Sequence, residues 1–262
     1  MGNTFISDIR DKAAKKFLKV AFPDAEDVRT LKAALTLKEK KIADPILVGP
    51  AAAIKKIAAD NGLDIGAVPI VDPAADAAKA ELANVLYEKR KAKGMTPEQA
   101  AETAKSPLYY AGLLLATDKV GAVVGGNLSS TGDVIRAAIH TVGTAPGIST
   151  VSSYFIMVFP ERLLCYADCA VVPNPTDAQL ADIAISSAKN FQAVTGEEPR
   201  VAMLSFSTKG SAQHADVDKV VSATKIAKEK APNLLLDGEM QADAALVASI
   251  GERKCKGSPV AG

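Results

Sequence analysis

The residues best suited to chemistry lie between Val120 and Ala138, in the sequence VGAVVGGNLSSTGDVIRAA. After an apolar run and two glycines, this stretch brings three hydroxyl residues, an acid and an arginine: Ser129, Ser130, Thr131, Asp133 and Arg136. Small residues let a ligand approach the backbone, a helix start offers free N–H groups, and a guanidinium matches two oxygens of a phosphate or carboxylate. The stretch predicts an oxyanion site at the end of a strand. An ordinary capped helix with a solvated arginine would leave the same pattern. No Walker or dinucleotide-binding motif is present to favour the oxyanion site over this alternative.

Two further stretches carry polar groups directly after a predicted strand. Ser205–Ser211 (SFSTKGS) combines hydroxyls, a glycine and a lysine, so it could hold a phosphate through backbone N–H groups and the lysine charge. Asp237–Asp243 (DGEMQAD) places three carboxylates near a predicted turn. Those acids could fix the loop, remove a proton or cap the next helix, and capping is the favoured interpretation for Asp237 and Glu239.

Histidine and cysteine chemistry is not favoured. The chain has two histidines and three cysteines. Cys165 and Cys169 would share a face of a helix, but no second pair completes a zinc site, so we expect the cysteines to be structural. His140 and His214 are interpreted as surface or core residues rather than as catalysts.

The elements that must position these groups alternate between helix and strand patterns. Predicted helices are 6–17, one after the acids Asp24, Glu26 and Asp27 through Leu37, one opened by Pro50, 80–91, 96–103, 107–117, one opened by Thr176, 217–230 and 240–250. Predicted strands are 18–22, 43–49, 68–71, 122–124, 150–159, 163–172, 200–205 and 234–236. Such alternation predicts an α/β fold with mainly parallel sheets flanked by helices. Thr144–Gly147 is the candidate hinge, so residues 1–146 and 147–262 are the predicted lobes.

Composition excludes several classes of protein. The chain has 262 residues, of which 48% are hydrophobic, and a formal net charge of +1. These values indicate a globular protein and argue against a nucleic-acid-binding one. Apolar runs are too short to span a membrane, and Met1–Arg10 lacks the layout of a secretory signal, so a cytoplasmic protein without membrane partners is expected.

Segments along nearly the whole chain resemble the phosphotransacetylase (phosphate acetyl/butyryltransferase) family. They are 22–27, 43–49, 87–95, 129–136, 151–157, 167–170, 173–176, 205–211 and 237–243. The resemblance implies reversible transfer of an acetyl group between acetyl phosphate and coenzyme A, by direct attack of the coenzyme A thiolate. It also implies two lobes of the isocitrate/isopropylmalate dehydrogenase type, a homodimer and no tightly bound cofactor, with coenzyme A as a substrate.

The same resemblance assigns roles to individual residues. Arg136 matches an arginine that binds phosphate or coenzyme A, and Arg90 matches one placed at coenzyme A. A hydroxyl loop near the acetyl phosphate corresponds to Ser129, Ser130 and Thr131, which with Arg136 form the expected catalytic set. Expected substrate-binding residues are Arg90, Asp133, Ser207, Thr208, Lys209 and Gly210. Positive charge and hydroxyl donors would stabilise the leaving phosphate without a metal.

The sequence also departs from the family pattern. Gly132 and Ala137 stand where the family often has alanine and proline, which loosens the predicted loop. The sequence ends at Gly262, before a family segment that carries the proposed thiol base and a second arginine. If the chain is complete as given, a weakened or inactive enzyme is expected unless another chain supplies these residues; a truncated sequence of a full-length enzyme is the simpler explanation. The alternatives are a phosphate butyryltransferase, a non-catalytic coenzyme A-binding relative and, with least support, a nicotinamide-linked dehydrogenase.

Overall fold

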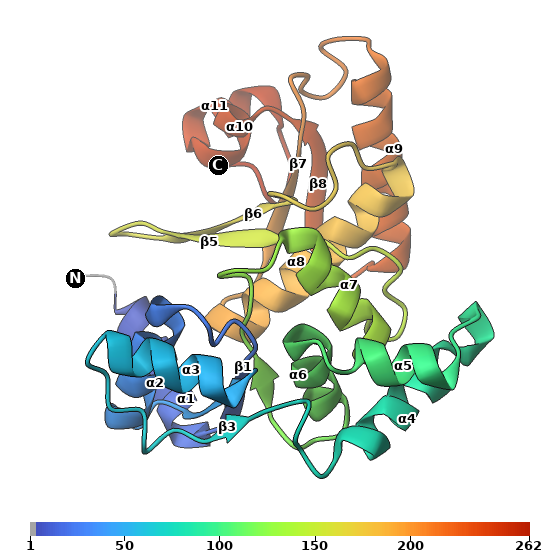
Figure 1. Ribbon diagram of the computed structural model, residues 1–262. Helices are drawn as coiled ribbons and strands as arrows, with labels where there is room; N and C mark the ends of the chain where they lie inside the picture. The colour runs from blue at the N-terminus through green and yellow to red at the C-terminus, as the bar shows by residue number, and fades with distance from the viewer. Residues whose placement is uncertain (1–3) are drawn as a thin grey trace. The chain divides into compact units, whose positions relative to one another are not determined.

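The chain forms two compact units in the computed structural model, which describes residues 4–262 (Figure 1). The N-terminal unit comprises residues 6–143, and the C-terminal unit comprises residues 144–262 together with Thr4 and Phe5. This division follows Gly143, whereas the sequence places the boundary after residue 146. The first three residues of the predicted first lobe lie outside the described residues.

A parallel sheet with the strand order β3-β2-β1-β4 forms the centre of the N-terminal unit. Its strands are β1 (Lys19–Phe22), β2 (Asp44–Val48), β3 (Ile70–Val71) and β4 (Ala122–Val123). The chain winds from β1 towards β3 on one side and returns to β4 on the other. Open parallel sheets bind ligands beyond the strand ends where the winding changes direction, and here that place lies between β1 and β4.

Helices cover both faces of this sheet. The helical elements are α1 (Phe5–Lys16), α2 (Val28–Glu39), α3 (Ala51–Asp60), α4 (Lys79–Arg90), the 3-10 turn η1 (Lys91–Lys93), α5 (Pro97–Thr103), α6 (Pro107–Ala116) and α7 (Thr131–Thr141). Successive strand residues point to opposite faces, so Leu47 packs with α2 and α3 while Val48 packs with α4, α5 and α6. Figure 1 shows the same division, with α2 and α3 on one side of the strands and α6 on the other.

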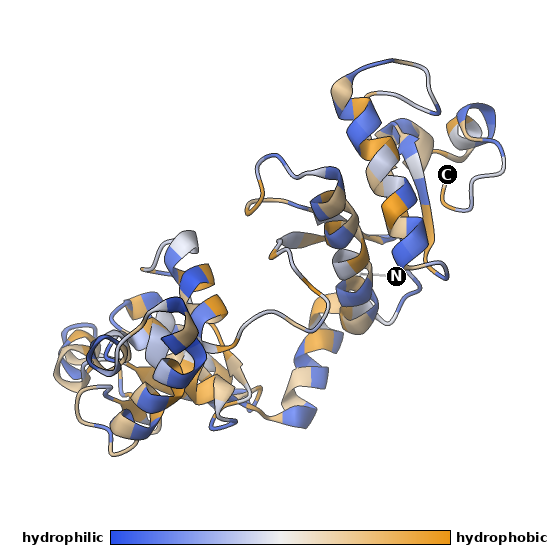
Figure 2. Ribbon diagram, turned by 90° about the vertical axis from the view of Figure 1, so that its right-hand side faces the viewer, coloured by the Kyte–Doolittle hydropathy of each residue, from blue (hydrophilic) through white to orange (hydrophobic). Residues whose placement is uncertain are grey.

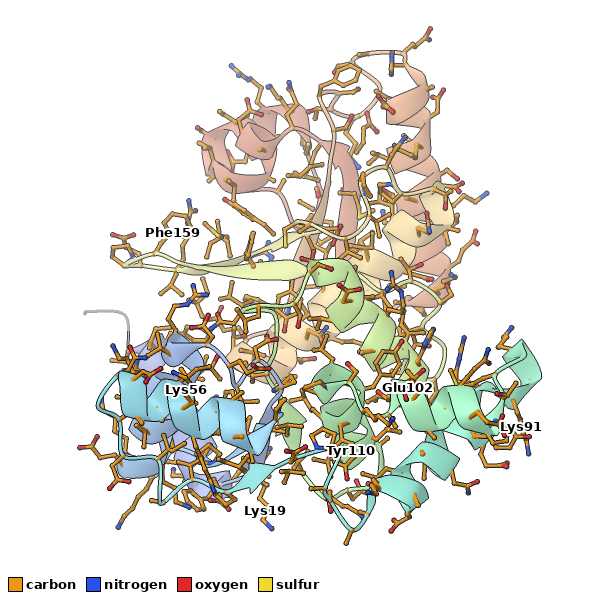
Figure 3. The ribbon with its side chains drawn as sticks, in the orientation of Figure 1. Lys19, Lys56, Lys91, Glu102, Tyr110 and Phe159 are labelled. Atoms are coloured by element: carbon orange, nitrogen blue, oxygen red, sulfur yellow. The ribbon has the colours of Figure 1, made fainter. Side chains whose placement is uncertain are left out.

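Local sequence signals explain where several of these helices begin. The Asp27 carboxylate accepts a hydrogen bond from the Arg29 backbone at the start of α2, and Thr96 and Gln99 form a capping box at the start of α5. Tyr110 of α6 is fully buried inside the unit, whereas Lys56 and Lys91 extend from its surface (Figure 3).

The C-terminal unit has a parallel pair, β7 (Arg200–Leu204) with β8 (Leu235–Met240), and an antiparallel pair, β5 (Tyr154–Val158) with β6 (Leu163–Ala167). Its helices are α8 (Asp177–Thr195), α9 (Ala215–Lys230), α10 (Ala242–Leu246) and α11 (Ala248–Lys254). One face of the β7–β8 pair packs on α8 and α9, and the other packs on α10, α11 and Val260. Figure 1 shows α9 and the pair α10–α11 on opposite sides of these strands.

The fold is the predicted mixed α/β type with parallel sheets flanked by helices, and three local predictions are wrong. Strand β8 continues through Asp237 and Glu239, which the sequence placed in a loop, because both side chains find buried partners. The predicted helix 240–250 is two short helices, and the strand 163–172 ends at Ala167. The antiparallel hairpin of β5 and β6 was not anticipated.

Hydrophilic and hydrophobic residues alternate along the helices in Figure 2, as expected for helices that bury one face. No helix within residues 4–262 combines the length and the apolar character needed to cross a membrane.

Candidate functional site

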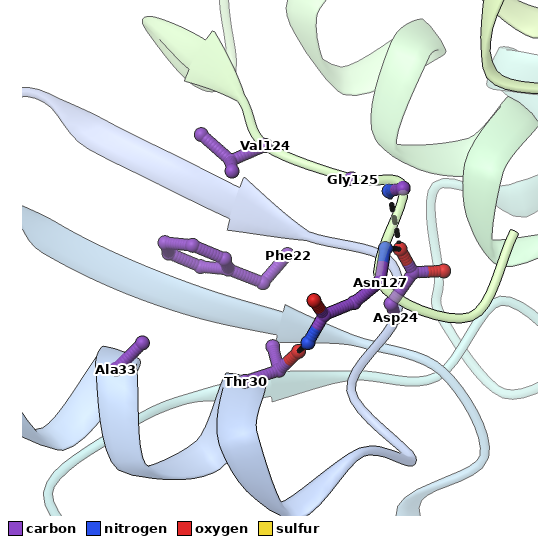
Figure 4. Close-up of a pocket in the computed structure, with 8 residues that line it drawn as sticks. Phe22, Asp24, Thr30, Ala33, Val124, Gly125 and Asn127 are labelled. Atoms are coloured by element: carbon purple, nitrogen blue, oxygen red, sulfur yellow. Dashed lines mark hydrogen bonds between the residues drawn. The ribbon is translucent and has the colours of Figure 1, made fainter. Parts of the chain in front are cut away.

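A buried aspartate fixes the loop that follows β4. The Asp24 carboxylate, only 5% exposed, accepts hydrogen bonds from the Gly126 N–H (2.5 Å), the Asn127 N–H (2.7 Å) and the Ser129 hydroxyl (2.7 Å). Two of these bonds are drawn in Figure 4. The carboxylate therefore joins the ends of β1 and β4, where the winding of the sheet changes direction.

The electrostatics of this loop favour an ionised Asp24. Burial alone would raise the pKa of Asp24, but the hydrogen bonds from the Ser129 hydroxyl and from the Gly126 and Asn127 N–H groups outweigh it. The pKa of Asp24 is therefore lowered from its usual value. An ionised carboxylate at this position holds the loop in one conformation.

A cavity of about 280 Å³ opens beside this loop (Figure 4). Its lining residues are Phe22, Asp24, Thr30, Ala33, Val124, Gly125, Gly126 and Asn127. The Asn127 amide donates to the Thr30 hydroxyl at 3.0 Å, and Asp24 is satisfied by the loop. Most polar groups of the cavity wall are therefore paired with one another. The cavity lies next to the predicted hydroxyl residues Ser129, Ser130 and Thr131, which do not line it.

The hydroxyl residues start α7, as the sequence predicted. Ser130 is the N-cap: its hydroxyl accepts from the Asp133 N–H at 3.2 Å and donates to the Asp133 carboxylate at 2.7 Å. Arg136 lies one turn further along and pairs with Asp133 at 2.9 Å, with both side chains more than half exposed. The start of α7 is thus a capped helix with an exposed arginine. Because Arg136 already pairs with Asp133, an anion would compete with the Asp133 carboxylate for the Arg136 guanidinium.

The charges of the two predicted arginines, Arg90 and Arg136, both act on His140 in the N-terminal unit. Arg90 ends α4 and Arg136 lies on α7, and the positive charges of both are felt by His140 on α7. Within residues 4–262 the Arg90 guanidinium makes no hydrogen bond or ion pair. Helices α4 and α6 both pack on α7, which brings these groups from distant parts of the sequence to one region. Arg90 and Arg136 thus lie near enough to His140 for both charges to act on it, and Arg136 pairs with Asp133; we call Arg90, Asp133 and Arg136 the cationic group.

The segment of Ser207, Thr208, Lys209 and Gly210 belongs to the C-terminal unit, where carboxylates of β8 hold it. The Glu239 carboxylate, 3% exposed, accepts from the Ser207 hydroxyl at 2.9 Å and from the Gly210 N–H at 2.7 Å. The Lys209 ammonium donates to Asp237 at 2.8 Å and to the Gly238 carbonyl at 2.9 Å. These hydrogen bonds fix the loop to β8, and of the three N–H donors of the Lys209 ammonium two are used by Asp237 and Gly238.

The pKa values of these acids fit that arrangement. Burial would raise the pKa of Asp237, but hydrogen bonds from Lys209 and Lys228 hold it well below its usual range. Burial likewise acts to raise the pKa of Glu239, and the Gly210 N–H and Ser207 hydroxyl lower it on balance. Helix capping by Asp237 and Glu239 was the favoured interpretation and is wrong, because both residues lie inside β8.

The cysteines form no disulfide with one another, and all three lie within the described part of the chain. Cys165 lies in β6 and Cys169 follows that strand, so the helical spacing considered for them does not apply. Among residues 4–262, no group of three His, Cys, Asp or Glu side chains is arranged to hold a metal ion.

Sequence reasoning did not foresee the contacts that four polar residues make in these regions. Asp24, Glu26 and Asp27 were together taken as the acids that cap the helix through Leu37, but Asp27 is the cap and Asp24 binds a loop about a hundred residues away. Asp168 was not singled out, although it accepts from the Ser153 hydroxyl and from three backbone N–H groups at the base of the β5–β6 hairpin. The hydrogen bond between Tyr109 and His140 joins residues 31 positions apart, and no local pattern marks it.

Comparisons with known proteins identify the family of this chain. The sequence profile of the family Phosphate acetyl/butaryl transferase matches residues 4–262. The phosphate acetyltransferase of Thermoanaerobacterium thermosaccharolyticum is 44% identical to this chain, covering 99% of it and 80% of the relative. The phosphate acetyltransferase of Acetivibrio thermocellus is 42% identical over 99% of this chain and 79% of its own length.

A solved structure extends the likeness to three dimensions. The crystal structure of a phosphotransacetylase from Streptococcus pyogenes aligns with a TM-score of 0.92 at 34% identity, covering 99% of this chain and 79% of that one. These matches run over almost all of the chain and agree with one another. The chain therefore belongs to the Phosphate acetyl/butaryl transferase family.

Proposed function

We propose that this protein is a phosphate acetyltransferase, which moves an acetyl group reversibly between acetyl phosphate and coenzyme A. The observation that carries the proposal is the cationic group of the N-terminal unit: Arg90, which has no hydrogen-bond or ion-pair partner among residues 4–262, and Arg136 beside the hydroxyl-rich start of α7. Such a group suits substrates that carry phosphate. Membership of the family and relatives named phosphate acetyltransferase supply the reaction.

The reaction needs charge stabilisation more than covalent help from the protein. The thiolate sulfur of coenzyme A attacks the carbonyl carbon of acetyl phosphate, a carbon–sulfur bond forms, and the bond from that carbon to the phosphate oxygen breaks. The bonding electrons leave with the phosphate, so negative charge moves onto that group. Preorganised donors aimed at the developing charge lower the barrier, because they need no reorganisation as the reaction proceeds.

We assign these roles to the predicted residues. Arg136 and Arg90 bind phosphate groups of the substrates, and the hydroxyls of Ser129, Ser130 and Thr131 serve the acetyl phosphate. Asp24 keeps the loop before α7 in place through its three hydrogen bonds. Asp133 releases Arg136 to the substrate when the anion binds, since their ion pair is exposed to solvent.

The loop of the C-terminal unit is assigned to the binding of phosphate-bearing substrates. Lys209 contributes positive charge through its remaining proton, and Ser207, Thr208 and Gly210 give the loop its shape. We further propose a cytoplasmic homodimer of the dehydrogenase-like two-lobed type, with coenzyme A as substrate and no tightly bound cofactor.

Turnover of two acyl phosphates tests the proposal. The purified chain is given coenzyme A with acetyl phosphate or butyryl phosphate, and thioester formation is followed by its absorbance. We expect acetyl-coenzyme A formation, with a higher kcat/KM for acetyl than for butyryl phosphate. A preference for butyryl phosphate would contradict the acetyl assignment, and coenzyme A binding without turnover of either substrate would indicate a non-catalytic relative.

A further inference from the structure

Tyr109 and His140 form a hydrogen-bonded pair that the roles assigned so far do not use. The Tyr109 hydroxyl lies 2.9 Å from His140 Nδ1, and the ring centroids are 5.8 Å apart. Tyr109 belongs to the first turn of α6 and His140 to the last turn of α7, two helices that pack on each other. Both side chains are half-buried, so the pair is neither core nor freely solvated.

Charged groups from each helix packed on this pair surround it. Arg90 of α4 and Arg136 of α7 act on both rings, and the Asp133 carboxylate of α7 acts on Tyr109. Burial lowers the pKa of His140, and the two arginines lower it further, so the imidazole is neutral near pH 7. A neutral imidazole whose Nδ1 accepts from the Tyr109 hydroxyl carries its proton on Nε2, which is then a donor.

The balance of charge in this group points to a ligand. Two guanidinium groups and one carboxylate, that of Asp133, act on Tyr109, and within the described residues this carboxylate forms an ion pair with Arg136 alone. Within the described residues the Arg90 guanidinium has no counter-charge in contact. A dianion placed between the arginines would supply it, and would also reverse the field that keeps His140 neutral.

Resting on the proposed function, we infer that Tyr109 and His140 complete, with Arg90 and Arg136, a binding site for a terminal phosphate dianion of the substrate, and that His140 takes up a proton as this phosphate binds. The imidazolium then donates from Nε2 towards the phosphate, while Tyr109 holds the ring in place. Two substrate groups share this chemistry: the 3′-phosphate monoester of coenzyme A and the phosphate of acetyl phosphate.

The measurement is proton uptake on binding. Isothermal titration of the full chain at pH 7.5, in two buffers with different ionisation enthalpies, counts protons bound per ligand for coenzyme A, dephospho-coenzyme A and acetyl phosphate. The variants are His140→Gln and Tyr109→Phe. His214→Asn is the matched control, because it removes the other histidine while asparagine retains the N-cap role that His214 has on α9.

Three results would support the inference. Wild type and His214→Asn take up a proton with coenzyme A or with acetyl phosphate, His140→Gln loses that uptake, and its affinity for the same ligand falls about 10- to 100-fold. Uptake with coenzyme A and none with dephospho-coenzyme A identifies the 3′-phosphate as the group bound. Uptake with acetyl phosphate alone identifies the acyl phosphate instead.

Other results would overturn it. Equal uptake in wild type and His140→Gln would exclude His140 as the acceptor while leaving the proposed function intact. Absence of binding by wild type with all three ligands would overturn the proposed function and this inference together. If His140→Gln folds poorly, the imidazole NMR signal of His140 in wild type decides: it must shift towards the protonated form on ligand addition, and a static signal contradicts the inference.

Discussion

Removing the Asp24 carboxylate should loosen the loop that precedes α7, because three donors of that loop have no other internal acceptor of equal strength. Asp24→Ala deletes the partner of the Gly126 and Asn127 N–H groups and of the Ser129 hydroxyl. A hydrogen bond to a charged group contributes about 1.5–3 kcal/mol. Three such bonds give an upper bound, because Gly126 and Asn127 are exposed and water can replace part of the loss. We expect a loss of about 3 kcal/mol in the free energy of unfolding.

The free energy of unfolding of the conservative variant Asp24→Asn should lie between those of the wild type and Asp24→Ala. Asp24→Asn keeps one oxygen of the carboxylate, and neutral hydrogen bonds are about half as strong as charge-assisted ones, so about half of the loss is expected. Displacement of the hydroxyl loop by about 1 Å would also lower kcat/KM for acetyl phosphate by about 100-fold. Glu26→Gln is the matched control, because Glu26 is an exposed acid in the same turn.

Urea unfolding followed by circular dichroism, together with the thioester assay, measures both effects. The order Glu26→Gln, Asp24→Asn, Asp24→Ala should rank the variants from least to most affected. If Asp24→Ala unfolds at the same urea concentration as Glu26→Gln and keeps the wild-type kcat/KM, the carboxylate does not organise the loop, and the reasoning from its hydrogen bonds is refuted.

Three further predictions concern binding, packing and pH. Arg136→Ala should lower kcat/KM for acetyl phosphate by an amount that corresponds to a loss of about 2–5 kcal/mol in transition-state stabilisation, whereas the exposed control Lys56→Ala should not. An Arg136→Ala variant with the kcat/KM of the wild type would refute the role of Arg136. Gly112→Ala should destabilise the chain by about 1–2 kcal/mol in urea unfolding, because the new Cβ would lie 2.2 Å from the Thr141 hydroxyl. Adding Thr141→Ala to the same chain should restore stability. If the destabilisations of the two single variants simply add in the double variant, the contact is contradicted. The folded-state pKa values of Asp24, Asp237 and Glu239 are all lowered. The contribution of these three acids to the free energy of unfolding is therefore present above about pH 5 and is lost as the pH falls from about 4 towards 2. A free energy of unfolding that rises on acidification below about pH 4 would contradict this prediction.

Much of the fold was predictable because strong local signals mark its elements. Thr96 and Thr176 each begin a capping box, and the long helix after Thr176 follows the apolar period expected for one buried face. Strands β1 and β2 are short apolar runs ended by turn residues, so their positions could be predicted to within a residue or two. Parallel pairing followed from the helices between them.

The errors occurred where tertiary contacts override local preference. Asp237 and Glu239 are poor strand formers, yet β8 includes them because Lys209, Lys228 and Ser207 supply partners inside the C-terminal unit. No pattern near either residue reveals those partners. The β5–β6 hairpin was missed for a similar reason: its two strands were found, but pairing direction is not encoded in the period of a single strand.

The residues of the candidate site stay a prediction, and only their positions in the fold can be compared with the sequence. Arg90, Ser129, Ser130, Thr131 and Arg136 were identified from motifs and resemblance, and their placement around α7 came from helix packing. Asp24 could have been suspected from its position at the end of a strand, where parallel sheets bind ligands. The side chain it would hold lies far along the sequence, and only the folded chain shows it.

Isotope exchange tests the central claim, direct transfer of acetyl between phosphate and coenzyme A, more directly than any variant. Labelled inorganic phosphate is incubated with the chain and unlabelled acetyl phosphate, with and without coenzyme A, and the label in acetyl phosphate is measured. Direct thiolate attack predicts label in acetyl phosphate only when coenzyme A is present, since the phosphate returns by attack on acetyl-coenzyme A. Label without coenzyme A would reveal an acyl-enzyme intermediate, and no label in either case would contradict the proposed activity.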